Sequence, residues 1–130
     1  MHKPLLVLMI LGRAIAGGDN TFVFAEVAPT LEKLIERFGP RTKRTNAALP
    51  FWHLKGDGFW KVELSAEPAG RVTRMALLDG DAKGRVIPEA WHELISDQEL
   101  ARRVARRLLV KHWDSEQRRQ VAEALALAPL

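Results

Sequence analysis

The sequence predicts an α+β fold, namely a mainly helical single domain with a small β-hairpin. Two observations lead to this prediction. Apolar residues recur at three- and four-residue spacing in several long segments, whereas two Phe-Trp pairs flank a short glycine-containing segment that suits a tight turn. The chain has 130 residues, 47% of them hydrophobic and 28% charged, which is enough for one domain with one contiguous core.

The first third of the chain contains two predicted helices joined by a short extended segment. Residues 3–16 form the first helix, because nothing after Pro4 interrupts it and the glycines at 17 and 18 end it. Residues 21–24 are expected to be extended. Residues 25–38 form the second helix, which carries apolar residues at helical spacing and ends at Gly39-Pro40.

The middle of the chain predicts the β-hairpin. Residues 41–50 are polar and basic and are expected to form a loop. Residues 51–54 and 59–64 are predicted strands joined through Lys55-Gly56-Asp57-Gly58, with one aromatic residue of each Phe-Trp pair facing the core. Residues 71–78 fit either a strand or a helix, and residues 79–84 form a loop with two glycines.

The last third of the chain predicts three helices. Pro88 begins a short helix that ends at Ile95. Residues 97–113 form the clearest helix, with an apolar face opposite four arginines. Residues 115–127 form the last helix, with Ser115 as its N-cap. The four arginines are Arg102, Arg103, Arg106 and Arg107.

Charge and cysteine content restrict the class of protein only loosely. Lysine and arginine number 20 against 16 acidic residues, a net charge of +4 that permits binding to nucleic acid without requiring it. The absence of cysteine excludes disulfides and Cys-based zinc sites and fits a reducing cytoplasm. Arg13 interrupts the apolar run near the N-terminus before it reaches the roughly 20 residues of a membrane span, so no membrane association is expected.

No group of residues has the spacing of a catalytic or metal site. His53, Asp57 and Glu63 are close in sequence, but alternation along the predicted hairpin separates their side chains. Phosphate-binding glycine loops, nucleophile elbows and calcium loops are absent. We therefore expect a binding protein rather than an enzyme, without a metal or cofactor. The histidines, which share no ligand spacing, are His2, His53, His92 and His112.

The best candidate for a functional surface is a basic and aromatic block over residues 41–60. The run Arg41-Thr42-Lys43-Arg44 precedes Pro50, whose apolar ring has no evident role in the core. The segment Lys83-Gly84-Arg85 supplies a second basic loop, in which glycine permits close backbone approach. The arginines at 102–107 form an alternative phosphate-binding face, or else a solvated face balanced by nearby acidic residues.

Several segments occur in an order that resembles a known family. They are His2-Lys3-Pro4-Leu5-Leu6-Val7-Leu8-Met9-Ile10-Leu11-Gly12-Arg13, Phe22 to Val27, Phe38-Gly39-Pro40, Pro50-Phe51-Trp52-His53-Leu54, Asp57-Gly58-Phe59-Trp60 and Lys83-Gly84-Arg85-Val86-Ile87-Pro88-Glu89. Together with the paired C-terminal helices they resemble the sulfur-binding domain of phosphorothioate-dependent (type IV, McrA-like) restriction endonucleases, over nearly the whole chain.

In that family the domain binds double-stranded DNA in which sulfur replaces one non-bridging phosphate oxygen. A separate C-terminal nuclease domain, usually of the His-Asn-His type, then cuts the DNA. The resemblance therefore implies that residues 1–130 are the recognition module of a restriction system, and that this chain contains no nuclease domain. The expected partners are phosphorothioated DNA and a fused or associated nuclease domain, in the cytoplasm.

The resemblance also implies an apolar cup that holds the sulfur. Sulfur is a poorer hydrogen-bond acceptor than oxygen, so an apolar cup accepts it readily but leaves a hydrated oxygen without partners. The matching residues are Lys3, Leu49, Pro50 and His53. The wider set of expected DNA contacts, with base reading at residues 83–85 and backbone contacts at residues 41–44, comprises His2, Arg13, Arg41, Lys43, Arg44, Arg71, Lys83, Gly84 and Arg85.

The chain departs from the family pattern at four of these positions. Leu49 stands where an aromatic residue is frequent, His53 where a smaller residue occurs, Lys3 in place of arginine and Arg85 in place of glycine. These differences leave the bases preferred beside the sulfur open. The sequence also leaves open a homodimer, and a general DNA-binding or protein-interaction module without sulfur selectivity.

Overall fold

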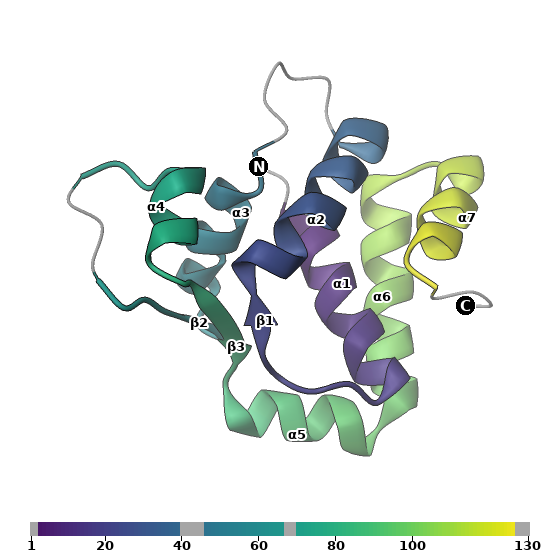
Figure 1. Ribbon diagram of the computed structural model, residues 1–130. Coiled ribbons are helices and arrows are strands. Elements are labelled where there is room, and N and C mark those ends of the chain that lie inside the picture. The colour runs from purple at the N-terminus through teal and green to yellow at the C-terminus, as the bar shows by residue number, and fades with distance from the viewer. Residues whose placement is uncertain (1–2, 40–45, 67–69, 127–130) are drawn as a thin grey trace. The chain divides into compact units, whose positions relative to one another are not determined.

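The computed structural model describes residues 3–39, 46–66 and 70–126. The chain forms two compact units: one holds Lys3 and the described residues between 20 and 87, and the other the described residues between 4 and 19 and from 88 onward. Helices dominate, and the strands form one small antiparallel sheet (Figure 1). The predicted α+β class is therefore confirmed.

The first unit combines the sheet with four helical segments. The strands β1 (Phe22–Val23), β3 (Lys83–Val86) and β2 (Trp60–Glu63) are hydrogen-bonded in that order, so β3 is central. Trp60 lies opposite Val86 and Glu63 lies opposite Lys83 in the register. The helical segments are α2 (Phe24–Phe38), α3 (Ala48–His53), the 3₁₀ helix η1 (Leu54–Asp57) and α4 (Arg74–Asp79).

The predicted hairpin is wrong, because its first strand is the helix α3 followed by η1. The Asn46 side-chain oxygen accepts a hydrogen bond of 2.7 Å from the Ala48 amide, an Asx turn that leads into the helix, whose N-cap residue is Ala47. Pro50 lies in its first turn, where no amide donor is needed. Gly58, with φ of 87°, ends η1 in a conformation that favours glycine. Strand β2 therefore pairs with the distant β3.

Two further segments differ from the sequence expectations. The ambiguous residues 71–78 contain the start of α4, whose N-cap Thr73 accepts a 3.0 Å hydrogen bond from the Ala76 amide. The predicted loop at residues 79–84 ends in β3, so Lys83-Gly84-Arg85 lies in a strand rather than a loop. Of the predicted loop at residues 41–50, residues 48–50 are helical and 41–45 lie outside the described residues.

An aromatic cluster holds α3 against the sheet. The ring centroid of Phe51 lies 5.0 Å from that of Phe24 and 5.4 Å from that of Trp60, in edge-to-face geometry. Trp60 also donates a 2.9 Å hydrogen bond from Nε1 to the Phe51 carbonyl oxygen. As predicted, one residue of each Phe-Trp pair is buried, while Trp52 and Phe59 are half-buried.

Gly84 is required by this packing, because a Cβ atom at this position would overlap the Trp60 ring. We expect Gly84→Ala to lower the free energy of unfolding by about 1–3 kcal/mol, the usual range for overpacking. Urea denaturation measures the change. Gly56→Ala is the matched control, because a Cβ atom there would meet nothing within 4 Å. Equal stability of the two variants would contradict this role of Gly84.

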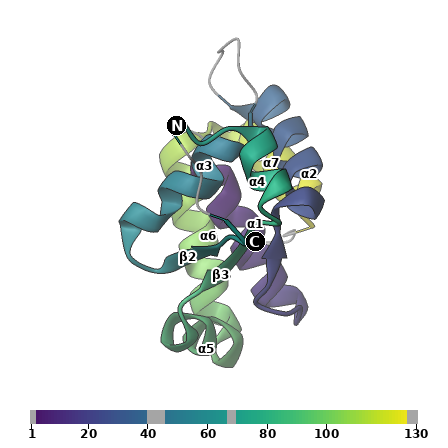
Figure 2. The same ribbon diagram turned by 60° about the vertical axis from the view of Figure 1, so that its left-hand side comes forward.

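The second unit is helical. It contains α1 (Lys3–Ala16, from Pro4 onward), α5 (Pro88–Ser96), α6 (Gln98–His112) and α7 (Ser115–Ala124), which confirms the predicted helices. Helix α1 runs beside α6 in both ribbon views (Figures 1 and 2), and Gln98 donates a 3.1 Å hydrogen bond to the Ile15 carbonyl oxygen. Among the described residues, no helix has the length and apolar character needed to cross a membrane.

The predicted cap of the last helix is wrong by one residue. Asp114 rather than Ser115 is the N-cap of α7. Its side chain accepts a 2.8 Å hydrogen bond from the Gln117 amide, and the Gln117 side chain accepts one from the Asp114 amide in return. A carboxylate at an N-cap also interacts favourably with the helix dipole, which explains the preference for aspartate.

Candidate nucleic-acid interface

Helix α3 carries three of the four residues expected to hold the sulfur. Leu49 and His53 are exposed and four residues apart, so they share one face of the helix. Leu49 is 39% exposed, which makes it the accessible apolar group of this turn. Pro50 is buried, so the expectation that its ring has no role in the core is wrong.

Lys3, the fourth residue, reaches the segment that follows α3. Its Nζ atom lies 3.5 Å from Asp57 Oδ1 at the end of η1. In the same segment Lys55 Nζ lies 3.3 Å from the centroid of the half-buried Trp52 ring, a cation–π contact. The structure therefore places two ammonium groups and an aromatic ring along the α3–η1 segment. Lys3 was an expected sulfur-binding residue, whereas Trp52 and Lys55 were expected only as members of the basic and aromatic block over residues 41–60.

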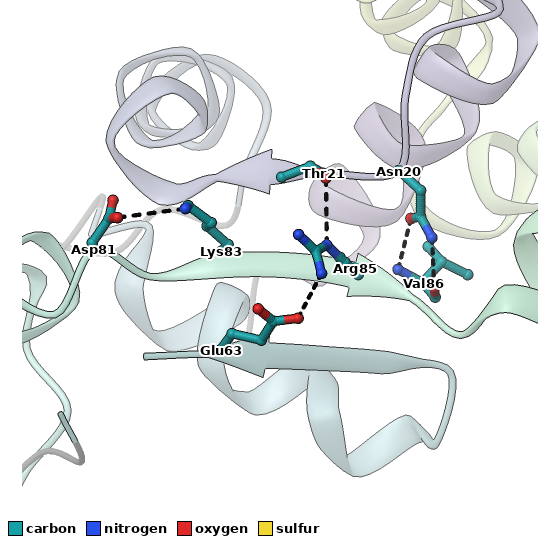
Figure 3. A network of polar contacts seen from close by, with 7 residues as sticks. All are labelled: Asn20, Thr21, Glu63, Asp81, Lys83, Arg85 and Val86. Atoms are coloured by element: carbon teal, nitrogen blue, oxygen red, sulfur yellow. Dashed lines mark hydrogen bonds and ion pairs between the residues drawn. The ribbon is translucent and has the colours of Figure 1, made fainter. Parts of the chain in front are cut away.

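The exposed face of the sheet carries the second group of expected DNA contacts. Along β3, Lys83 and Arg85 are the accessible positions, whereas Gly84 and Val86 are buried. Figure 3 shows Arg85 held between two neighbours, with Nη1 2.8 Å from Glu63 Oε1 and Nε 3.4 Å from Thr21 Oγ1. Gly84 is buried on the opposite side of the strand, where the Trp60 ring requires a glycine.

The Asn20 side chain fixes the end of β3 at Val86. Asn20 donates a 2.7 Å hydrogen bond to the Val86 carbonyl oxygen and accepts a 2.9 Å hydrogen bond from the Val86 amide (Figure 3). This double contact continues the backbone pairing beyond β1, which contains only two residues. It therefore anchors the strand that presents Lys83 and Arg85.

The other expected DNA contacts belong to other segments of the chain. Arg71 is exposed in the segment before α4. Arg13 belongs to the second unit, where Nη1 lies 3.7 Å from Asp19 Oδ1. The remaining expected contacts lie outside the described residues, and these are His2, Arg41, Lys43 and Arg44.

Sequence reasoning missed the acidic partners of the expected DNA contacts. Asp57 pairs with Lys3. Figure 3 shows the other two pairs, Glu63 with Arg85 and Asp81 with Lys83, the latter at 3.5 Å between Oδ2 and Nζ. The Asp81–Lys83 pair had a signal in the sequence, since the two residues are two positions apart. The other two pairs join residues that are distant in sequence and had no local signal. No group of three or more potential metal ligands occurs among the described residues.

The arginine face of α6 has a different electrostatic character. Arg106 Nη2 lies 2.6 Å from Glu99 Oε1. In contrast, Arg103, Arg107 and Lys111, spaced four residues apart along one line, have no ion pair within the described part of the chain. Beside this line lies a hollow of about 310 Å³, lined by Arg103, Arg106, Arg107, Val110 and Lys111.

Comparisons with known proteins identify the family. The sequence model of the ScoMcrA-like DNA sulfur-binding domain matches residues 1–130. The solved sulfur-binding domain of ScoMcrA, complexed with phosphorothioated DNA, has a TM-score of 0.81 and 24% identity, with 97% of this chain and 83% of that chain covered.

Two further solved structures are similar. The sulfur-binding domain of SprMcrA, complexed with phosphorothioated DNA, has a TM-score of 0.75 and 20% identity, with 97% and 80% of the two chains covered. The type IV phosphorothioation-dependent restriction endonuclease ScoMcrA has a TM-score of 0.74 and 25% identity, with 85% of this chain and 22% of that chain covered. No curated protein sequence matches. Because the family match spans every residue, the chain belongs to the ScoMcrA-like DNA sulfur-binding domain family.

Proposed function

We propose that the chain binds double-stranded DNA that carries a phosphorothioate in its backbone, as the recognition module of a modification-dependent restriction system. The observation that carries this proposal is the match of residues 1–130 to the DNA sulfur-binding family. The complexes of similar domains from ScoMcrA and SprMcrA with phosphorothioated DNA support the same ligand.

The sulfur contact is assigned to the exposed face of α3. Leu49 offers the sulfur an apolar surface, the rigid Pro50 beside it fixes the first turn, and His53 closes the same face. An oxygen placed against the Leu49 side chain loses hydration that this apolar group does not replace, at about 1–3 kcal/mol for each unsatisfied polar group. Lys3 contributes its methylene groups to the rim and its ammonium group to the retained negative charge.

The remaining DNA contacts are assigned to other basic residues of the chain. Lys83 and Arg85 project from the exposed side of β3. Paired β-strands are able to enter the major groove, so these two side chains are proposed to contact it. The basic run at residues 41–44, together with His2, Arg13 and Arg71, is proposed to contact phosphates. These contacts position the domain, whereas the α3 face distinguishes sulfur from oxygen.

The proposed activity is binding, and cutting is assigned to another domain. This chain covers only 22% of the ScoMcrA endonuclease chain that it resembles, so most of that enzyme lies outside the matched region. We propose that residues 1–130 act as one recognition domain in the cytoplasm and that a fused or associated His-Asn-His nuclease domain supplies the hydrolysis.

A competition experiment tests the proposal. A labelled duplex with one central phosphorothioate is bound to the protein and displaced either by the same unlabelled duplex or by its all-oxygen twin. We expect the oxygen twin to compete about ten- to a hundredfold less well, which corresponds to one unsatisfied polar group. Equal competition by the two duplexes would contradict sulfur recognition.

Three cations of α6 that have no ion pair among the described residues favour a second candidate function, namely general binding to a DNA backbone. Four-residue steps along a helix separate Arg103, Arg107 and Lys111 by about 6 Å each, so they present a line of positive charge. If this face alone carried binding, both duplexes would compete equally and would lose affinity with salt at the same slope. If the two duplexes bind with different affinities at the same salt concentration, a face other than that of α6 recognises the sulfur.

A further inference from the structure

Among the described residues of the first unit, three expected DNA-binding cations form ion pairs with carboxylates of the same unit. Lys3 faces Asp57, Lys83 faces Asp81, and Arg85 faces Glu63. The Arg85 contact is the shortest of the three, at 2.8 Å against 3.5 Å for each of the others. The cations of α6, Arg103, Arg107 and Lys111, have no such partner among the described residues.

The register of the sheet explains why Arg85 needs a carboxylate. Lys61 of β2 lies directly opposite Arg85, which places two positive side chains side by side on the exposed face. Like charges in directly opposed positions destabilise a strand pair. Glu63, two residues along β2, lies on the same face and accepts a hydrogen bond from Arg85, so one carboxylate compensates this repulsion.

A carboxylate that binds a guanidinium group resembles a phosphate that does so. Both offer two oxygens to the same pair of N–H donors, and both form charge-assisted hydrogen bonds. Glu63 is 59% and Arg85 45% exposed, so the pair is open to exchange with an incoming phosphate oxygen. Before the chain is bound to DNA, Glu63 therefore occupies the position on Arg85 that a phosphate would take.

We propose that Glu63 is a specificity-setting positioning residue, which holds Arg85 and competes with DNA phosphates for it. This proposal rests on the DNA-binding function proposed above. On ordinary DNA a released Arg85 would gain a phosphate contact in any register along the duplex. When sulfur fixes the register, Arg85 is directed at the major groove rather than at a phosphate, as proposed above, so Glu63 weakens binding to ordinary DNA more than binding to the modified site.

Glu63→Gln tests the proposal, because glutamine keeps the shape of the side chain and removes its charge. We expect the variant to bind an all-oxygen duplex about two- to fivefold more tightly, the range that an exposed ion pair supports. The slope of log K against log salt is expected to become steeper by about 0.9, as for one added phosphate contact. Binding to the phosphorothioate duplex is expected to gain less, so the preference for sulfur falls.

Two matched variants separate this effect from net charge. Glu36→Gln removes one exposed negative charge from α2 of the same unit, and Glu36 has no ion pair among the described residues. Glu99→Gln releases Arg106 of α6 from an ion pair of the same kind. An equal gain in affinity for the all-oxygen duplex in Glu36→Gln or Glu99→Gln would overturn the proposal, because the effect would not be specific to Arg85.

A double-mutant cycle shows whether the effect passes through Arg85. In the Arg85→Gln background, Glu63→Gln is expected to leave affinity for the all-oxygen duplex unchanged. An undiminished gain in that background, or weaker binding by Glu63→Gln alone, would overturn the proposal. Each of these results is a change in the affinity for the all-oxygen duplex. Failure of sulfur recognition itself would instead appear as equal binding of the two duplexes by the unaltered protein.

Discussion

Leu49→Asn is expected to remove most of the preference for a phosphorothioate duplex over its all-oxygen twin. The asparagine amide donates hydrogen bonds to oxygen and replaces the apolar surface that favours sulfur. The ratio of the two affinities should therefore fall by about ten- to a hundredfold, which corresponds to 1–3 kcal/mol for one satisfied polar group. Because Leu49 is exposed, the fold should be retained. Competition binding with both duplexes measures the ratio.

Met75→Asn is the matched control for this substitution. Met75 is 64% exposed on α4 of the same unit, so the change again replaces an accessible apolar side chain with an amide. It should leave the ratio of the two affinities unchanged. If Leu49→Asn retained the full preference, or if Met75→Asn reduced it equally, the assignment of sulfur recognition to α3 would be wrong.

Phe51→Ala is expected to have the largest effect on stability. Phe51 is fully buried and lies within about 5 Å of two other aromatic rings, 5.0 Å from Phe24 and 5.4 Å from Trp60. Replacing a buried phenylalanine with alanine lowers the free energy of unfolding by about 3–5 kcal/mol. Urea denaturation measures the loss. DNA binding should weaken as well, because Phe51 anchors the helix that carries Leu49.

Phe59→Ala provides the comparison for Phe51→Ala. Phe59 is half-buried next to Trp60, so the same substitution there removes fewer packing contacts. Its loss of stability should be clearly smaller. Equal losses at the two positions would show that the aromatic cluster around Trp60 is not what holds α3 in place.

The long helices were predictable from sequence because their apolar spacing is repeated over several turns. Helices α1, α2 and α6 lie close to their predicted limits; Gly17 follows α1, Gly39 follows α2, and the Asp97 side chain caps the start of α6. Helix α3 was not predictable in the same way. It has only six residues, and Phe51 and Trp52 have side chains that are typical of strands. The helix becomes evident only from contacts that the structure shows, namely the Asn46 turn that leads into it and the hydrogen bond from Trp60 to the Phe51 carbonyl oxygen.

Which members of the candidate site lie side by side was predictable from local sequence only where they are close together in the chain. Leu49, Pro50 and His53 follow one another within a single helix. The Lys3–Asp57 contact joins residues 54 positions apart, and no local pattern encodes it. The Arg85–Glu63 contact likewise depends on the pairing of β2 with β3, which was not predicted because β2 was assigned to a local hairpin. Ion pairs across the sheet could therefore be identified only from the structure.

The central claim is that this chain distinguishes a sulfur atom from an oxygen atom in a DNA backbone. The most direct measurement is a titration of three duplexes of identical sequence at one salt concentration. One carries a single phosphorothioate of one stereochemistry, the second carries the other stereochemistry, and the third carries only oxygen. Binding of one stereoisomer at least about tenfold more tightly than the oxygen duplex is predicted, from one unsatisfied polar group. Identical affinities for all three duplexes would contradict the claim.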